Sequence, residues 1–113
     1  MDERKRIEPI LIKDKETEEV LYTLDFTRNT VSMAERRGFV LDDVTKFPLT
    51  GCRDLFYWAL QAHHRNLRRD QADELFDSLG GIEAEGLMKR LYELYNQAIL
   101  SGNEKNSKLT LQL

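Results

Sequence analysis

The alternation of apolar and polar residues over positions 20–27 is the clearest pattern near the N-terminus. Its apolar face consists of Val20, Tyr22, Leu24 and Phe26. Only Leu21 interrupts the polar face, and successive side chains of a strand point to opposite faces, so a half-buried strand is predicted here. A second short strand is predicted at residues 9–13, with the polar residues 14–19 between the two. We expect a β-hairpin whose apolar face packs against the longest helix, because a lone hairpin is marginal in water.

Residues that start and end helices dominate the chain after this hairpin. Thr27 is a typical N-cap, and Gly38 stands where a left-handed residue would end the helix that follows. Residues 42–48 are expected to form one helical turn that ends at Pro48, because the residue before a proline disfavours helical geometry. Three further helices are expected: Gly51–Leu67 after Thr50, a short helix from a cap at Asp70 to Leu79, and Ile82–Leu100.

The order of strands before helices predicts the α+β fold class, with an N-terminal β-hairpin followed by a small bundle of three to five α-helices. A chain of 113 residues forms one domain around one core. We expect a flexible N-terminal arm at residues 1–6, a single α+β domain at residues 7–102 and a flexible C-terminal tail at residues 103–113. Three residues of that tail alternate at the spacing of a strand: Leu109, Leu111 and Leu113.

Composition and charge exclude several classes of protein. The chain has 17 basic and 20 acidic residues, and a net charge of −3 disfavours a dedicated nucleic-acid binder. The longest apolar run, residues 55–60, is far shorter than the roughly 18 residues of a membrane span. No secretory signal pattern follows Met1, and the single cysteine fits a reducing compartment. We expect a cytoplasmic protein without a membrane segment.

The adjacent pair His63 and His64 and the lone Cys52 are the residues that most invite a catalytic or metal-binding role. Neighbouring side chains on a helix point about 100° apart, so the two imidazoles would not share one ion, and Cys52 would lie about 16 Å from His63. A position beside Arg53 near a helix start could lower the pKa of the Cys52 thiol. The favoured interpretations are a packed or surface histidine pair and, for Cys52, a small buried core residue. No catalytic residue, cofactor or metal is predicted.

Charge divides the chain into a basic and an acidic part. Residues 28–69 carry eight basic and four acidic side chains, a net of +4, whereas residues 70–104 carry two basic and eight acidic side chains, a net of −6. The favoured interpretation is that neighbouring helices neutralise each other. The alternative is a pair of oppositely charged surfaces that guide docking of protein partners.

A basic cluster at the C-terminal end of the expected long helix gives a second functional hypothesis. Its arginines, Arg65, Arg68 and Arg69, could contact the phosphates of a nucleic acid. The segment lacks interleaved aromatic residues that would stack on bases. A small nucleic-acid-binding regulator is therefore kept only as the alternative to a protein-binding role.

Two apolar stripes run along the expected last helix. The first consists of Leu87, Leu91, Leu94 and Ala98, and the second of Met88, Tyr92, Tyr95 and Ile99. A helix at the rim of a small domain usually buries less than both stripes together, so the second stripe is predicted to contact a protein partner or another copy of the chain. The leucines of the tail could also add an edge strand to a neighbour's hairpin. A broad core face with a disordered tail is the equally weighted alternative.

Four segments of the chain together resemble a family of small proteins from long-tailed phages and prophages of Gram-positive bacteria. These segments are Tyr22–Val31, Glu35–Phe39, Leu60–Arg65 and Leu87–Tyr95. The family consists of tail assembly chaperones, which are functional counterparts of the lambda-type tail chaperone. The resemblance covers roughly residues 20–99 and rests on a pattern of strand, helix end and helix.

The resemblance implies a non-enzymatic protein of the host bacterial cytoplasm. Such a chaperone binds the tape measure protein, helps to recruit tail tube subunits, tends to self-associate and is not part of the mature virion. In the lambda-type system a ribosomal frameshift adds a C-terminal domain that engages the tube protein.

Overall fold

The computed structural model describes residues 6–100 and 108–113. An antiparallel hairpin of β1 (Ile10–Lys13) and β2 (Val20–Leu24) precedes five α-helices, which confirms the predicted α+β class. The helices are α1 (Arg28–Arg36), α2 (Asp43–Lys46), α3 (Pro48–Gln61), α4 (Arg69–Ser78) and α5 (Leu87–Leu100), with a short 3₁₀ helix η1 (Gly81–Glu83) before α5. Residues 1–5 of the predicted arm and residues 101–107, where the predicted domain ends and the tail begins, lie outside the described residues.

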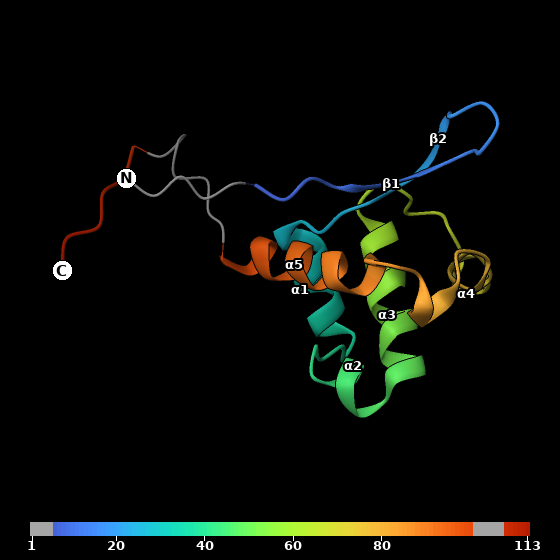
Figure 1. Cartoon of the computed structure of the whole chain (residues 1–113). Helices are drawn as coiled ribbons and strands as arrows, with labels where there is room; N and C mark the ends of the chain where they lie inside the picture. Colours follow the sequence, from blue (N-terminus) through green and yellow to red (C-terminus); the bar gives the residue numbers. More distant parts are fainter. Residues whose placement is uncertain (1–5, 101–107) are drawn as a thin grey trace.

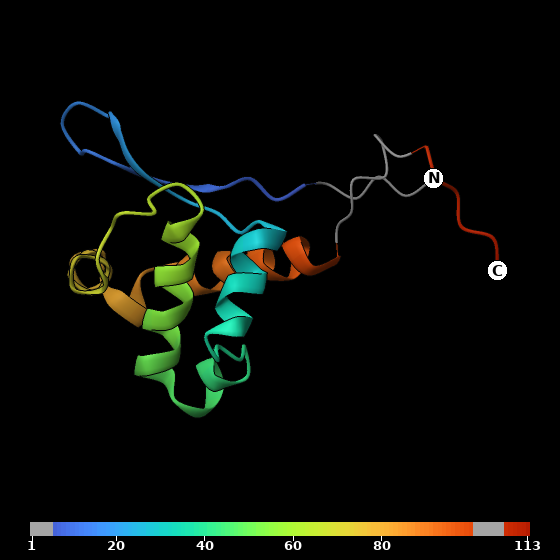
Figure 2. The same ribbon diagram turned by 180° about the vertical axis from the view of Figure 1, so that it is seen from behind.

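The helices are arranged around α3. α1 and α4 pack on two sides of α3, and α5 crosses α1 and α3 (Figures 1 and 2). β2 contacts α3 at the end of the helix opposite to α2 (Figure 1). The molecule therefore has two distant ends, one formed by the hairpin and the other by α2 and the start of α3.

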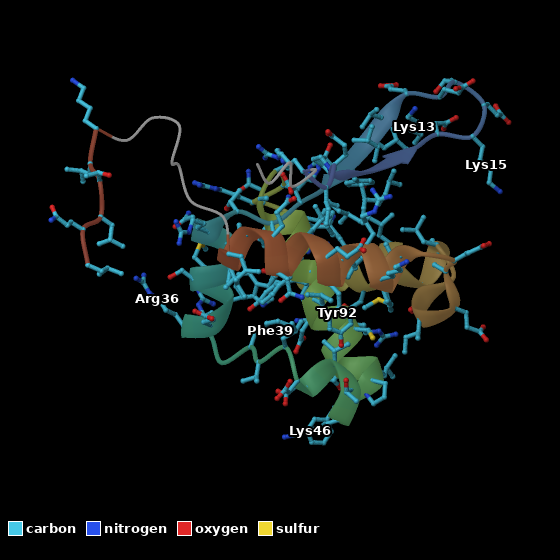
Figure 3. The ribbon with its side chains drawn as sticks, turned by 60° about the vertical axis from the view of Figure 1, so that its left-hand side comes forward. Lys13, Lys15, Arg36, Phe39, Lys46 and Tyr92 are labelled. Carbon is cyan, nitrogen blue, oxygen red and sulfur yellow. The ribbon has the colours of Figure 1, made fainter. Side chains whose placement is uncertain are left out.

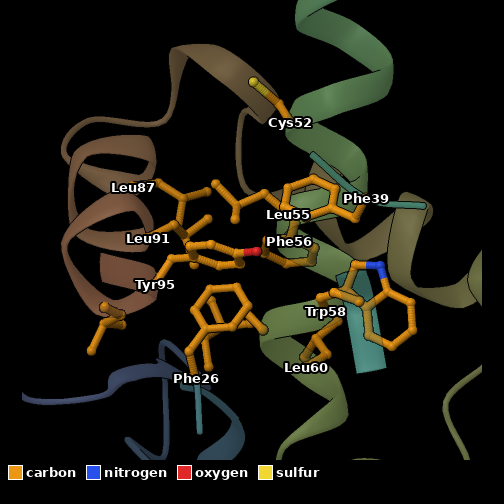
Figure 4. Close-up of a cluster of buried hydrophobic side chains, with 14 of the residues drawn as sticks. Phe26, Phe39, Cys52, Leu55, Phe56, Trp58, Leu60, Leu87, Leu91 and Tyr95 are labelled. Atoms are coloured by element: carbon orange, nitrogen blue, oxygen red, sulfur yellow. The ribbon is translucent and has the colours of Figure 1, made fainter. Parts of the chain in front are cut away.

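The core forms where α3, α5 and the segment after β2 meet (Figure 4). Phe56 and Leu60 of α3 and Leu91 of α5 are fully buried. Phe26, just after β2, packs edge-to-face on Tyr95 of α5, with ring centroids 5.0 Å apart. Residues from the beginning, the middle and the end of the described chain thus share one core.

The hairpin packs on the helices through only part of its apolar face. Leu24 and Phe26 are buried and Tyr22 is partly buried, whereas Val20 is about half exposed. The prediction that all four apolar residues of this face pack on the long helix is therefore wrong for Val20. The physical reason is that the hairpin loop extends beyond the helices, where no element covers it (Figure 1).

The predicted ends of the first helix are confirmed. Thr27 is the N-cap of α1, and its Oγ1 accepts a hydrogen bond of 3.1 Å from the N–H of Thr30. Gly38 has a φ of 90°, a left-handed conformation in which a side chain would be strained. This turn brings Phe39 back into the core.

The predicted bounds of the long helix, Gly51–Leu67, are wrong at both ends. α3 begins at Pro48, which the sequence pattern placed at the end of a turn. Proline suits the first position of a helix, because its missing N–H would have no partner within the helix. α3 ends at Gln61, and residues 62–67 form turns instead of a further helical turn.

The starts of α4 and α5 also differ from prediction. Arg68, not Asp70, is the N-cap of α4, and its N–H donates to Oε1 of Gln71 at 3.0 Å. The helix predicted over Ile82–Leu100 is divided into η1 and α5. Gly86 lies between them with a φ of 77°, a conformation that a right-handed helix does not contain.

Candidate protein-binding surfaces

The buried Cys52 belongs to the core rather than to a reactive site. Its side chain is buried beside α3 residues of the core, and burial raises the pKa of its thiol. The prediction of a small core residue is confirmed, and the alternative of a lowered thiol pKa is wrong. Within residues 6–100 and 108–113, no group of three or more histidine, cysteine or acidic side chains is placed to hold a metal ion.

The adjacent histidines attach the hairpin to the end of α3. Nε2 of His64 accepts a hydrogen bond of 3.0 Å from the N–H of Thr23 in β2. Nε2 of His63 lies 3.8 Å from Oδ2 of Asp25. Desolvation, with a further contribution from the charge of His63, lowers the pKa of His64, which favours the neutral ring that accepts this bond. His64 therefore has a structural role, because it joins β2 to the end of α3.

The basic cluster does not lie on the long helix as predicted. Arg65 lies in the turns after α3, Arg68 caps α4, and Arg69 is the first residue of α4. Arg68 contacts Asp70 at 3.1 Å, whereas Arg65 forms no ion pair with another described residue. The three arginines are all exposed on a bend of the chain rather than on one helical face.

Acidic residues of α3 and α4 neutralise most of the neighbouring basic charge. Arg69 pairs with Asp54 of α3 and, at 3.1 Å, with Asp73 of α4. Arg53 of α3 contacts Asp77 of α4 at 3.0 Å. These pairs support the favoured interpretation that adjacent helices neutralise each other, and they leave less free positive charge for phosphate contacts than the sequence suggested.

The two stripes of α5 have different environments. Leu87, Leu91, Leu94 and Ala98 are buried, so the core role of the first stripe is confirmed. In the second stripe Met88 and Tyr92 are partly buried against the core and Ile99 is exposed. The prediction that Tyr95 contacts a partner is wrong, because its side chain is only 2% exposed. Phe26 and Phe39 both pack on its ring, and Figure 3 shows Phe39 and Tyr92 on the same side of α5.

Large apolar side chains are exposed at the end of the molecule formed by α2 and the start of α3. Val40, Phe47 and Leu49 are 52%, 62% and 54% exposed, and we call these three residues the corner patch. Lys46, next to Phe47, marks this end in Figure 3, far from Lys13 and Lys15 of the hairpin. Isolated exposed apolar residues are ordinary, but these three belong to the short segment that forms this end of the molecule, which makes the end a candidate surface for an apolar partner.

The backbones that carry the corner patch are held close together. A Cβ atom at Gly51 of α3 would lie 2.5 Å from the Cα of Val44 in α2, so only glycine permits this contact. Val44 itself is buried. The patch is therefore presented by a tightly packed pair of helices rather than by a free loop.

A second surface, which we call the β1 groove, lies beside the outer edge of β1. It is an open groove of about 580 Å³ between β1 and the connection from α4 to α5. Figure 3 shows the hairpin above this end of α5. The groove is lined by residues 9–13 and by Leu79, Ala84, Glu85, Gly86, Leu87 and Arg90.

The sequence predicted the hairpin edge as an acceptor for the tail leucines, but it indicated neither the corner patch nor the groove beside that edge, for a physical reason. Phe47 and Leu49 flank the proline that begins α3, and the first turn of a helix that starts at a corner has few neighbours. A correct assignment of Pro48 as a helix start would have indicated this exposure. The β1 groove depends on elements about 70 residues apart, and no local pattern reports such a contact.

Comparison with known proteins places the chain in one family. Among the described helices, none has both the length and the apolar character that crossing a bilayer requires. Neither a curated protein nor a solved structure matches the chain. One family model, described as a domain of unknown function (DUF5055), matches residues 4–113. Because this match extends over nearly the whole sequence, the chain belongs to the DUF5055 family.

Proposed function

We propose that this protein is a non-enzymatic phage tail assembly chaperone. It binds the tape measure protein and helps to recruit tail tube subunits in the host cytoplasm, without entering the mature virion. The observation that carries the protein-binding part of this proposal is the exposure of the corner patch. The identity of the client comes from the resemblance to tail assembly chaperones described above.

The corner patch has the energetics of a binding surface. Complete burial of a large apolar side chain contributes about 1.5–3 kcal/mol, so covering three side chains that are already half buried contributes about 2–4 kcal/mol. The tight contact of Gly51 with α2 holds the backbones of α2 and the start of α3 together before binding. A fixed surface loses less conformational entropy when it binds than a flexible one does.

A helical segment with an apolar stripe is the partner that this surface fits best. Phe47 and Leu49 project from the first turn of α3, where they can fit between the side chains of a second helix. Asp43 and Lys46 lie beside them and offer one charge of each sign at the rim. A tape measure protein, as a very long helical protein, would supply such stripes repeatedly.

Co-expression of the full chain with the tape measure protein of the same tail gene cluster tests this proposal. We expect a soluble complex that co-purifies, and we expect the double variant Phe47→Ser with Leu49→Ser to weaken it about tenfold or more, because about 1.4 kcal/mol of lost burial corresponds to a factor of ten. Leu21→Ser is the matched control, since Leu21 is also about half exposed but lies on the hairpin.

Two results would contradict the proposal. One is a folded wild-type chain that does not co-purify with the tape measure protein. The other is a corner-patch variant that binds as well as Leu21→Ser does.

Fluorescence anisotropy with random duplex DNA at low salt examines the alternative function. Binding that Arg65→Glu removes would favour a nucleic-acid-binding regulator.

A further inference from the structure

The outer edge of β1 has an unused backbone hydrogen-bonding position. The N–H groups of Thr23 and Asp25 point away from β1, toward His64 and the carbonyl of Ala59. In an antiparallel pair, the backbone N–H and C=O groups of alternate residues point toward the partner strand. Those of Tyr22 and Leu24 therefore point toward β1, and those of the residue opposite Thr23 point away from β2. That residue is Leu11, and no described residue hydrogen-bonds with its N–H or C=O.

We infer that the β1 groove binds residues 108–113 of a second copy of this chain as an added strand. The inference concerns self-association and rests on the hairpin edge and the tail, not on the client of the proposed function. Leu109, Leu111 and Leu113 are all strongly exposed, and residues 108–113 contain neither glycine nor proline. Their alternation with Thr110 and Gln112 gives an extended segment with one apolar face.

The groove and the segment are complementary in chemistry. Its apolar lining includes Leu11, which is 50% exposed, and Leu79, which is also partly exposed. Added strands gain affinity from backbone hydrogen bonds and specificity from alternate side chains that enter a pocket. The charged residues of the lining are Lys13, Glu85 and Arg90, and Glu85 is the one whose charge is opposite to that of Lys108, the only charged side chain of the segment.

The geometry of α5 points to a second copy rather than to the same chain. The groove lies at the N-terminal end of α5, and the tail follows its C-terminal end, about 21 Å away at 1.5 Å per residue. The eight Cα steps from Leu100 to Lys108 reach about 27 Å only when fully extended. The face of α5 along this path is already occupied, because the backbone of Ile7 hydrogen-bonds with Gln97 and that of Glu8 with Arg90 (Figure 1).

Light scattering of the full-length chain over a concentration series tests the inference. We expect the wild type to self-associate at high micromolar concentration and Leu111→Glu to weaken this association about tenfold or more. Thr110→Glu is the matched control, since it adds the same charge at the next residue, on the opposite face of the segment. Equal association of both variants would overturn the inference, as would a wild type that remains monomeric.

A variant of the groove tests the other side of the contact. Leu11→Pro removes the outward N–H, and proline is tolerated in an edge strand when its N–H would face solvent. We expect this variant to lose self-association while it still binds the client through the corner patch. A failure of the self-association inference can therefore be distinguished from a failure of the proposed chaperone function. If Leu11→Pro unfolds, Leu111→Glu still tests the inference, because Leu111 is exposed and lies outside the helices and strands.

Disulfide trapping distinguishes a second copy from the same chain. Two differently tagged preparations, one carrying Leu11→Cys and the other Leu111→Cys, are mixed and oxidised. We expect a mixed disulfide dimer in higher yield than with Thr110→Cys in place of Leu111→Cys, and the native Cys52 is buried and does not compete. Yields that do not differ would overturn the inference. So would a chain carrying both Leu11→Cys and Leu111→Cys that forms only an internal disulfide.

Discussion

The two edges of the hairpin have opposite environments. The outer edge of β2 is fixed to the end of α3, where Asp25 donates to the carbonyl of Ala59 at 3.1 Å and Thr23 donates to His64 at 3.0 Å. The outer edge of β1 faces an open groove, and no described residue hydrogen-bonds with the backbone of Leu11 on this edge. One edge thus belongs to the folded core, and the other is available to a further strand.

The open edge is also short, which limits what it can bind. An exposed edge strand tends to pair with other chains, and proteins restrict this with prolines, charges and bulges. Pro9 precedes β1, Lys13 ends it, and a register shift lies between Ile12 and Lys13. The edge therefore favours one short, specific strand over unlimited pairing of sheets.

Truncation of one leucine on each strand should give the largest difference between the edges. Leu24→Ala removes a fully buried side chain, so we expect it to lower the free energy of unfolding by roughly 2–5 kcal/mol. Leu11→Ala removes a half-exposed side chain, and we expect a loss below about 1 kcal/mol. Chemical denaturation of both variants measures these values. Equal losses would show that the β1 edge is as well packed as the β2 edge.

The bond between His64 and β2 should have an intermediate effect. His64→Phe keeps a ring beside Tyr22, whose centroid lies 5.3 Å away, but removes the acceptor for the N–H of Thr23. We expect a loss of about 1 kcal/mol in the free energy of unfolding. His63→Phe is the control, because the nearest atom of Asp25 lies at 3.8 Å and His63 is exposed. A control that loses as much stability would argue against a specific role for His64.

The same bond predicts a pH dependence of stability. The pKa of His64 is lowered in the folded protein, so below its usual value near 6.5 the unfolded chain binds a proton that the folded chain does not. This contribution is fully present above pH 6.5 and is lost as the pH falls toward the lowered pKa. We expect the free energy of unfolding to decrease more between pH 7 and pH 5 in the wild type than in His64→Phe. Identical pH profiles would contradict this assignment.

The last comparison of the two edges uses the unmodified protein and involves no change in its stability. At low micromolar concentration, we expect the amide of Leu11 to exchange with solvent much faster than the amides of Thr23 and Asp25, because only the latter two are hydrogen-bonded to the rest of the fold. Amide exchange followed by NMR measures this difference. Strong protection of Leu11 in the monomer would show that its edge is covered.

Local patterns were sufficient for much of the fold. The alternation around Leu24, the cap at Thr27 and the left-handed Gly38 each depend on neighbouring residues, and each was predicted correctly. The end of α3 was not, because residues 62–67 turn so that His64 reaches Thr23, 41 positions earlier. A contact over that separation leaves no periodic signal near either residue.

The candidate surfaces were harder to predict for the same reason. Tyr95 has the helical spacing of a partner-facing residue, but Phe26 and Phe39 arrive from other elements and bury it. Neutralisation of the basic residues by a neighbouring helix was the favoured interpretation, but the pairing of Arg69 with Asp54 of α3 depends on how the two helices pack. The sequence predicted which residues are apolar or charged, and tertiary packing decided which of them stay exposed.

The contact between Ile7 and Gln97 has a consequence for how the chain is synthesised. The side-chain amide of Gln97 accepts from the N–H of Ile7 at 2.6 Å and donates to its carbonyl at 3.2 Å, over 90 positions. A ribosome releases the N-terminal segment first, so Ile7 has no docking site until α5 has emerged. The segment before β1 is therefore held in place only after α5 has emerged, and until then a nascent chain exposes the face of α3 that packs on α5.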